Sequence, residues 1–445
     1  MNNCNNNRAI ESCTVNLMSQ HVLYPHLIVP SARVSSNSLA ELVSLVPWRA
    51  NVAFWTFYGM FRAVFLVMAG EWNEQKQGGC EMHVGVGTIF QNPGKTRTDQ
   101  EVYENDLRLA DLVEPLGFDS IWTVEHHFTD YTMCPDPFQF LTWMAARTEH
   151  IQLGSMVVVL PWHDPMRVAE QVSMLDNMSG GRLILGMGRG AGRIEFDGFG
   201  VPMNESRERF VESAEMLLKG LEQGYCEYNG KFVKQHKADI RPAPFKSFKG
   251  RTYAAAVSPE SSKIMAELGV GLLIIPQKPW KEVDRELANY REIYREVNGT
   301  NAPAPILAGW TFCDEDGERA REMAKKYIGG YFHTVLEHYE FAKKPLNDTK
   351  GYEYYGNIAA KIAQYGEDGF IEFFMNLQIF GTPDECYNRI IEFSERTGAE
   401  RFVGVFSYSG MPWEESERNM RLFSEKVLPR LRTAEQSKWK KRAVA

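Results

Sequence analysis

Ionisable residues that suit acid–base catalysis lie together in the stretch Glu125-His126-His127, directly after a predicted strand. Imidazole titrates near neutral pH, so a histidine at a strand end can accept and donate protons under physiological conditions. Neighbouring residues of a strand point to opposite sides, so only one of the two histidines can face a site there. Even with His163 nearby, adjacent histidines supply one metal ligand at best, and we expect no metal. The stretch therefore predicts one acid–base histidine.

Arg189, Ser258 and Ser261 together have the chemistry of a phosphate-binding site. Arg189 lies between glycines at the end of a predicted strand, and its planar guanidinium suits bidentate contact with phosphate. Ser258 and Ser261 open a predicted helix, where hydroxyl and backbone N–H groups lie at the positive end of the helix dipole. A surface ion pair for the arginine and a helix cap for the serines are the ordinary alternatives. The combination favours a phosphate-bearing ligand.

Other catalytic patterns are missing from the sequence. There is no Gly-x-Ser-x-Gly elbow, and no cysteine lies in an evidently activated position, so nucleophilic hydrolysis has little support. Glycines alternate from Gly186 to Gly192, but Ala191 stands in the place of the third glycine of a dinucleotide-binding fingerprint. The sequence therefore argues against a Rossmann fold.

The elements that must position these residues alternate regularly from Met82 onward. Each predicted strand is a nearly continuous apolar run, as expected for parallel strands covered by helices, and helical sequence follows it. Thr98 to Glu101 forms a capping box, and Pro383 stands in a first helical turn. Eight such units favour a (β/α)8 TIM barrel over an open sheet, with its site at the C-terminal strand ends. The predicted strands are residues 83–90, 118–124, 151–160, 182–187, 253–257, 271–275, 306–312 and 401–406.

The chain divides into an irregular N-terminal extension (1–81), the barrel (82–434) and a basic C-terminal tail (435–445). Within the barrel we expect residues 336–374 to be an insertion before the last strand that forms a lid. The extension contains an apolar run at 51–70 that is long enough to cross a bilayer. Arg62 interrupts this run, and an arginine at mid-membrane costs roughly 2.5–3.5 kcal/mol. We expect a poorly structured or non-native extension, with membrane association as the alternative.

Composition excludes several classes of protein. The 445 residues include 49 basic and 57 acidic side chains, a net charge of −8 without a basic stripe, so nucleic acid is not an expected partner. Seven cysteines without CxxC spacing argue against a disulfide framework and favour a cytoplasmic location. We expect no membrane partner.

Four segments together resemble the luciferase-like flavin-dependent monooxygenases. They are residues 125–129 (Glu-His-His-Phe-Thr), 160–165, 175–182 and 381–383 (Gly-Thr-Pro), and the resemblance extends from Met82 to about Arg432. It implies a barrel that receives reduced FMN (FMNH2) from a separate NAD(P)H-dependent flavin reductase and uses O2 to oxygenate a small organic substrate. We also expect a homo- or heterodimer.

The resemblance implies a role for individual residues. His126 matches the catalytic histidine, with Glu125 and His127 beside it in the motif. Met156 and Val157 match a non-prolyl cis peptide under the flavin ring, and Gly188 stands where luciferases have a reactive cysteine. This substitution, together with Asp164 in place of a histidine before Pro165, puts light emission and aldehyde specificity in doubt. The phosphate of the flavin would contact Arg189, Arg207, Ser258 and Ser261, the last at a position where luciferases have threonine.

Three alternatives stay open at this point. A deazaflavin-dependent oxidoreductase of the same fold would use the same phosphate-binding residues. A non-catalytic flavin-binding partner subunit would retain the fold, although the intact Glu125-His126-His127 stretch speaks against it. A metallo-hydrolase is the third. Phe128, Trp162 and Trp310, close to predicted strand ends, favour an apolar or aromatic substrate.

Overall fold

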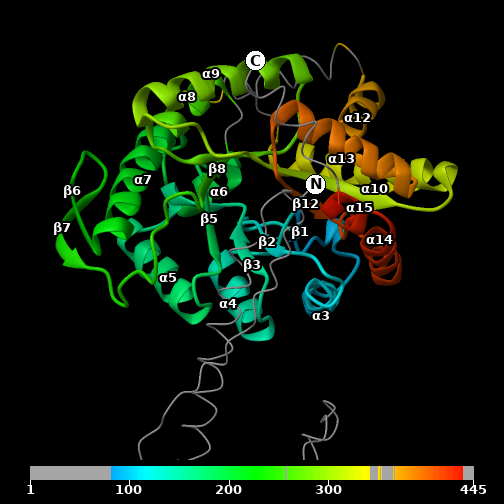
Figure 1. The fold of residues 1–445 in the computed structure, drawn as a ribbon, viewed down its shortest axis with the longest axis horizontal. Helices are drawn as coiled ribbons and strands as arrows, with labels where there is room; N and C mark the ends of the chain where they lie inside the picture. Colours follow the sequence, from blue (N-terminus) through cyan, green and yellow to red (C-terminus); the bar gives the residue numbers. More distant parts are fainter. Residues whose placement is uncertain are drawn as a thin grey trace, which may run out of the picture. The chain divides into compact units, whose positions relative to one another are not determined.

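Eight parallel strands close into a barrel, which confirms the predicted (β/α)8 fold (Figure 1). Every strand pairs with its sequence neighbour, and the last pairs with the first, where Gly85 is opposite Val403. Each of the eight predicted strands has a counterpart. In order around the barrel they are β1 (His83–Thr88), β2 (Ser120–Thr123), β3 (Gln152–Ser155), β5 (Leu183–Gly188), β8 (Thr252–Ala255), β9 (Gly271–Ile274), β10 (Ile306–Cys313) and β12 (Arg401–Val405).

The computed structural model describes residues 82–255, 258–340, 349–350, 352, 364 and 366–433. They all belong to one compact unit, residues 78–445. The predictions for the N-terminal extension and the C-terminal tail lie outside the described residues. Most of the predicted lid does too, since only the end of α10 (Gly317–His338), a few single positions and α12 (Glu367–Met375) are described there.

Helices surround the barrel and alternate with its strands (Figure 1). The predicted capping box of Thr98 with Glu101 is present, and Pro383 stands in the first turn of its helix as predicted. Thr382 and Glu385 form a second capping box there, which was not predicted. Among the described helices, none combines the length and the apolar character that crossing a bilayer requires. The covering helices are α3 (Asp99–Asp111), α4 (Pro137–Arg147), α5 (Pro165–Met178), α7 (Ser206–Gln223), α8 (Pro259–Glu267), α9 (Trp280–Asn298), α10, α13 (Pro383–Thr397) and α14 (Trp413–Lys426).

The structure corrects several predicted boundaries. The predicted strand 151–160 is divided into β3 and β4 (Val158–Val159) around a cis peptide bond between Met156 and Val157. The helical sequence after the last strand predicts one helix over residues 414–432, but it is divided into α14 and α15 (Leu428–Thr433), because Pro429 lacks the N–H that a continuous helix needs. Four elements were not predicted: β6 (Tyr225–Asn229) and β7 (Lys234–Asp239), which form a hairpin beside α7, the short helix α6 (Arg193–Phe199), and β11 (Ile379–Gly381).

Large side chains fill the barrel interior, so it is a packed core rather than a pore. Trp122, Ile184, Tyr253 and Leu273 belong to one buried cluster inside the strands. A Cβ atom on Gly154 would lie 2.1 Å from the Trp122 ring, so only glycine leaves room for this indole. The core closes the barrel below the C-terminal strand ends and leaves that end for a site.

Asp106, on α3, is a carboxyl group buried behind β1. One of its oxygens accepts a hydrogen bond from the Phe90 N–H at 2.9 Å, and the other accepts one from the Ser407 hydroxyl at 3.0 Å. Burial outweighs these hydrogen bonds and raises the pKa of Asp106 to about 6. Because this pKa is higher than in the unfolded chain, the group favours folding most below about pH 4, and this contribution is lost as the pH rises to about 6.

We expect Asp106→Asn to stabilise the protein at pH 7. Asparagine can accept from the Phe90 N–H and donate to Ser407, and it avoids burying a charge. The gain in the free energy of unfolding should approach about 3 kcal/mol at pH 7 and disappear near pH 4, where the aspartic acid is neutral. Urea denaturation of both proteins at the two pH values measures this, and an equal difference at both would contradict the assignment.

Candidate active site

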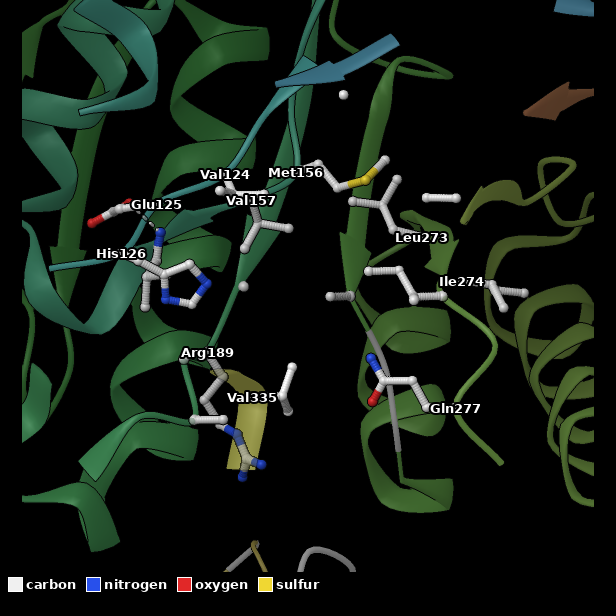
Figure 2. A pocket seen from close by; sticks show the side chains of 18 of the residues that line it. Val124, Glu125, His126, Met156, Val157, Arg189, Leu273, Ile274, Gln277 and Val335 are labelled. Carbon is white, nitrogen blue, oxygen red and sulfur yellow. Dashed lines mark hydrogen bonds between the residues drawn. The ribbon is translucent and has the colours of Figure 1, made fainter. Parts of the chain in front are cut away.

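A cavity of about 300 Å³ opens at the C-terminal ends of the strands. Figure 2 shows Glu125, His126 and Arg189 on one side of it, and Leu273, Ile274 and Gln277 on the other. The structure brings together nine of the ten residues predicted for the site, and only His127 is not in the lining. The nine are Glu125, His126, Met156, Val157, Gly188, Arg189, Arg207, Ser258 and Ser261.

His126 is fixed at the cavity by a carboxylate that the sequence did not indicate. Its Nδ1 lies 2.9 Å from Oε1 of Glu195, a fully buried residue of α6. The same oxygen accepts the backbone N–H of His127 at 2.9 Å, which fixes the loop as well as the ring. A carboxylate only accepts hydrogen bonds, so the Nδ1 of His126 must carry the proton. This leaves Nε2 as the atom that can exchange a proton with a ligand.

A second histidine, His338 at the end of α10, approaches the same oxygen of Glu195, and its ring centroid lies 5.1 Å from that of His126. Its Nε2 lies 3.5 Å from Oε1 of Glu195, and its Nδ1 lies 2.9 Å from the Thr129 hydroxyl. Burial alone would raise the pKa of Glu195, but His126 and His338 lower it to about 2. Glu195 is therefore an anion at physiological pH, held between two imidazoles.

The side chains of Glu125 and His127 bond to each other and to the surrounding protein, and they hold the wall of the site in place. Oε1 of Glu125 lies 3.0 Å from Nε2 of His127 and 2.7 Å from Nε2 of His163, and Oε2 accepts the Val159 N–H at 2.7 Å. Burial opposes the charge of Glu125, but these partners lower its pKa. The carboxylate points away from the cavity in Figure 2. Of the three motif residues, His126 is therefore the one whose side chain is available to a reacting molecule.

Arg189, directly after β5, is at the opposite end of the cavity from the barrel core. Its guanidinium lies over the ring of Tyr352, 4.0 Å from the centroid. Tyr352 is fully buried and donates a hydrogen bond to the carbonyl of Gly190 at 2.8 Å. Gly190 has a φ of +78°, and a Cβ there would lie 2.9 Å from the Trp162 ring, so the turn that presents Arg189 requires glycine. The ring of Tyr352 and the turn at Gly190 together fix the position of Arg189.

The two predicted serines lie at the start of α8, where they cap the helix and line the cavity. Ser258 is the N-cap, and its hydroxyl accepts the Ser261 N–H at 3.2 Å while the two hydroxyls lie 2.9 Å apart. Both side chains line the cavity at the positive end of the helix dipole. Arg207 of α7 reaches the same helix turn, where its Nη2 lies 3.0 Å from Glu260. Two arginines, two hydroxyls and a helix N-terminus can bind one phosphate group.

The carboxylate of Glu260 would compete with an anionic ligand for Arg207. For FMN, the ligand expected from the sequence, replacement of Glu260 by glutamine should strengthen binding by about twofold to fivefold, because exposed ion pairs of this kind are weak. Fluorescence quenching of FMN on the full-length protein measures the affinity. Glu267→Gln, at the far end of α8 beside Lys263, is the matched control and should change nothing. Weaker FMN binding by the Glu260 variant would contradict the assignment.

Aromatic residues form the remaining wall of the cavity. Of Phe128, Trp162 and Trp310, which the sequence suggested for an apolar wall, two are present in it. Trp162 and Trp310 line the cavity, together with Tyr131 and Tyr331. Phe128 does not. Its side chain is 59% exposed outside the cavity and packs on Phe199 with ring centroids 5.0 Å apart. Only Trp162 and Trp310 therefore contribute to the apolar wall that the sequence suggested, and Phe128 does not.

The family model described as luciferase-like monooxygenase matches residues 82–401 of the chain. The alkanal monooxygenase alpha chain of Photorhabdus luminescens is 27% identical over 355 residues, which cover 78% of this chain and 97% of that protein. The oxygenase component of a flavin-dependent trigonelline monooxygenase from Acinetobacter baylyi is 27% identical over 261 residues, 57% of this chain and 72% of that protein.

Solved structures share the fold. The crystal structure of monooxygenase RslO1 from Streptomyces bottropensis has a TM-score of 0.66 and 27% identity, and covers 78% of this chain and 99% of that one. The coenzyme F420-dependent tetrahydromethanopterin reductase of Methanopyrus kandleri, at a TM-score of 0.54 and 24% identity, covers 79% of this chain and 99% of that one and shares the fold alone. With a matched family model over most of its length and this site at the strand ends, the chain belongs to the luciferase-like monooxygenase family.

Proposed function

We propose that the chain is the oxygenase of a two-component system: it binds reduced FMN delivered by a separate NAD(P)H-dependent flavin reductase and uses O2 to oxygenate a small apolar molecule. The observation that supports this most is one cavity with a phosphate-binding end, Arg189 and Arg207 with the serines of α8, and an acid–base histidine, His126, held by Glu195. The trigonelline enzyme, whose name includes "oxygenase component", supports the division of labour with a reductase.

The residues around the phosphate-binding end fit FMN. The Nε of Arg207 is buried and has no hydrogen-bond partner among the described residues, as expected for a donor that binds an anionic ligand. A Cβ on Gly188 would lie 2.3 Å from Cγ2 of Val157, so only glycine leaves room for the Val157 side chain in this wall of the cavity. When bound, reduced flavin supplies the electrons that activate O2. The protein binds the phosphate, excludes water with its apolar wall and moves a proton at Nε2 of His126.

Oxygen consumption tests this function. The full-length protein, supplied with FMN, NADH and a flavin reductase, should form oxygenated product from members of a panel of aldehydes, ketones, terpenes and aromatic compounds. Parallel reactions with reduced deazaflavin under argon test the main alternative, a hydride-transferring oxidoreductase. Turnover with deazaflavin alone would favour that alternative, and flavin binding without turnover on either cofactor would favour a non-catalytic partner subunit.

A dimer in the cytoplasm belongs to the same proposal. Trp143 of α4 and Met174 and Met178 of α5 are more than half exposed, and these neighbouring helices thus present large apolar side chains to solvent. The four described cysteines are free thiols, which suits a reducing compartment. For a homodimer, light scattering should give about twice the 50.8 kDa mass of the chain. For a heterodimer, the chain should reach about that mass only after a related subunit is added.

The reaction we propose needs no metal ion. Ligand atoms of His126, Glu195 and His338 lie within 4.8 Å of one another, a spacing that a divalent cation would tolerate. However, Oε1 of Glu195 already accepts hydrogen bonds from His126 and from the backbone of His127. We expect elemental analysis of the purified protein to find no stoichiometric metal, and EDTA to leave oxygen consumption unchanged. A stoichiometric metal whose removal abolishes turnover would instead support a metalloenzyme.

A further inference from the structure

The indole N–H of Trp310 is a buried donor that lacks a hydrogen-bond partner among the described residues. Trp310 lies on β10, is 6% exposed and lines the cavity. Tryptophan N–H groups usually find an acceptor when they are buried, and an unsatisfied donor weakens the fold unless something else uses it. In the wall of an active-site cavity, the molecule that can provide the acceptor is a ligand.

The orientation of this indole is fixed by its surroundings. Its ring centroid lies 4.1 Å from that of Tyr331 and 5.7 Å from that of Phe374. The backbone N–H of Trp310 donates to the side-chain oxygen of Gln378 at 3.2 Å, which anchors the residue on the strand. A donor held in this way can select a ligand oxygen by position.

The same wall leads to the acid–base histidine. The hydroxyl groups of Tyr131 and Tyr331 lie 2.5 Å apart, so one of them donates a hydrogen bond to the other. The ring of Tyr131 is 4.8 Å from the imidazole of His126. A ring-shaped molecule on this wall would therefore extend from His126 toward the indole of Trp310, with aromatic side chains along its length.

The aromatic neighbours of Trp310 favour a neutral ligand group beside the indole. Its ring packs against those of Tyr331 and Phe374, which are uncharged. A carboxylate beside the indole would lose its hydration and gain a single neutral donor, which makes burial of an anion unfavourable. A carbonyl or ether oxygen loses little hydration and needs only one donor.

We propose that Trp310 is a specificity-determining residue of the site, and that the substrate is a neutral ring compound whose carbonyl or ether oxygen accepts a hydrogen bond from Nε1 of Trp310. This inference rests on the proposed function, since it assigns the substrate class of the same cavity. The ring packs on the wall of Tyr131, Tyr331 and Trp310, and the oxygen orients it with respect to His126.

Binding of matched bicyclic probes tests the proposal. 1-Tetralone has the ring and the carbonyl, tetralin lacks the oxygen, and 1-naphthoate carries an anion. Equilibrium dialysis against the full-length, FMN-loaded protein gives the affinity for each. Trp310→Phe retains an aromatic ring and removes the donor, so it should weaken 1-tetralone binding by about tenfold and change tetralin binding less than twofold. 1-Naphthoate should bind more weakly than 1-tetralone to the wild-type protein.

Trp413→Phe is the matched control, because Nε1 of Trp413 is also buried and has no hydrogen-bond partner in the described part of the chain, but Trp413 does not line this cavity. It should leave all three affinities unchanged. Equal losses for tetralone and tetralin in Trp310→Phe, or no measurable tetralone binding to the wild-type protein, would overturn the proposal. A parallel loss of FMN affinity in Trp310→Phe would also overturn it, since the donor would then serve the flavin. Failure of the wild-type protein to bind FMN would refute the proposed function instead.

Discussion

Replacement of His126 by alanine is expected to lower product formation by about 10²- to 10⁴-fold, the usual contribution of a positioned acid–base group. The affinity for FMN should stay within about twofold of the wild-type value, because the groups that fit the phosphate are Arg189, Arg207 and the serines of α8. Reduced flavin should still react with O2, so oxygen consumption should continue and release hydrogen peroxide in place of product. The ratio of product to oxygen consumed, measured with a flavin reductase and NADH, gives the effect directly.

Two further variants separate the acid–base role from damage to the fold. His150→Ala removes an exposed histidine, 85% exposed at its side chain, and should leave the product-to-oxygen ratio unchanged. Glu195→Gln keeps an acceptor for Nδ1 of His126 but removes the negative charge, so it should lower the ratio less than His126→Ala does. A wild-type ratio in His126→Ala would refute the role of this residue.

Replacement of Arg189 by alanine is expected to weaken FMN binding by about 1.5–3 kcal/mol, or roughly 10- to 150-fold in dissociation constant. This is the range for hydrogen bonds with a charged partner, and the fixed position of the guanidinium over Tyr352 favours the upper half of it. FMN titration of the full-length protein measures the change. Once FMN is saturating, the product-to-oxygen ratio should return to the wild-type value.

Arg189→Lys and Arg209→Ala provide the comparison. Lysine keeps the charge but loses the planar fork, so its effect should be intermediate. Arg209, paired with Glu205 on α7 and outside the cavity, should be dispensable for FMN. Unchanged FMN affinity in Arg189→Ala would remove the phosphate assignment from this end of the cavity.

The barrel could be predicted because each of its strands is a buried apolar run bounded by turn residues. The hairpin of β6 and β7 was missed for the opposite reason. Its side chains are mostly exposed, and a polar strand beside a helix carries little hydrophobic signal. Helix α6 is short and its N-cap, Gly192, provides no side-chain hydrogen bond, so it lacks the usual start signal.

The phosphate-binding end could be predicted because arginine, glycine and serine occur at strand ends in recognisable local patterns. The partner of His126 could not, since Glu195 is 69 residues away and only the closed barrel brings the two together. His338 and Tyr352 come from the region after β10 and have no local pattern that points to the site. The roles of Glu125 and His127 likewise depend on His163 and Val159, which tertiary structure alone places beside them.

The most direct test of the central claim is the fate of the oxygen atoms. The full-length protein is supplied with FMN, a flavin reductase, NADH and a compound from the panel that it converts to product. The reaction runs under ¹⁸O₂, and the product is analysed by mass spectrometry. A flavin-dependent monooxygenase incorporates one ¹⁸O atom from O2 into each product molecule and requires reduced FMN. Product that contains no ¹⁸O, or that forms at the same rate under argon with reduced deazaflavin, would contradict the account.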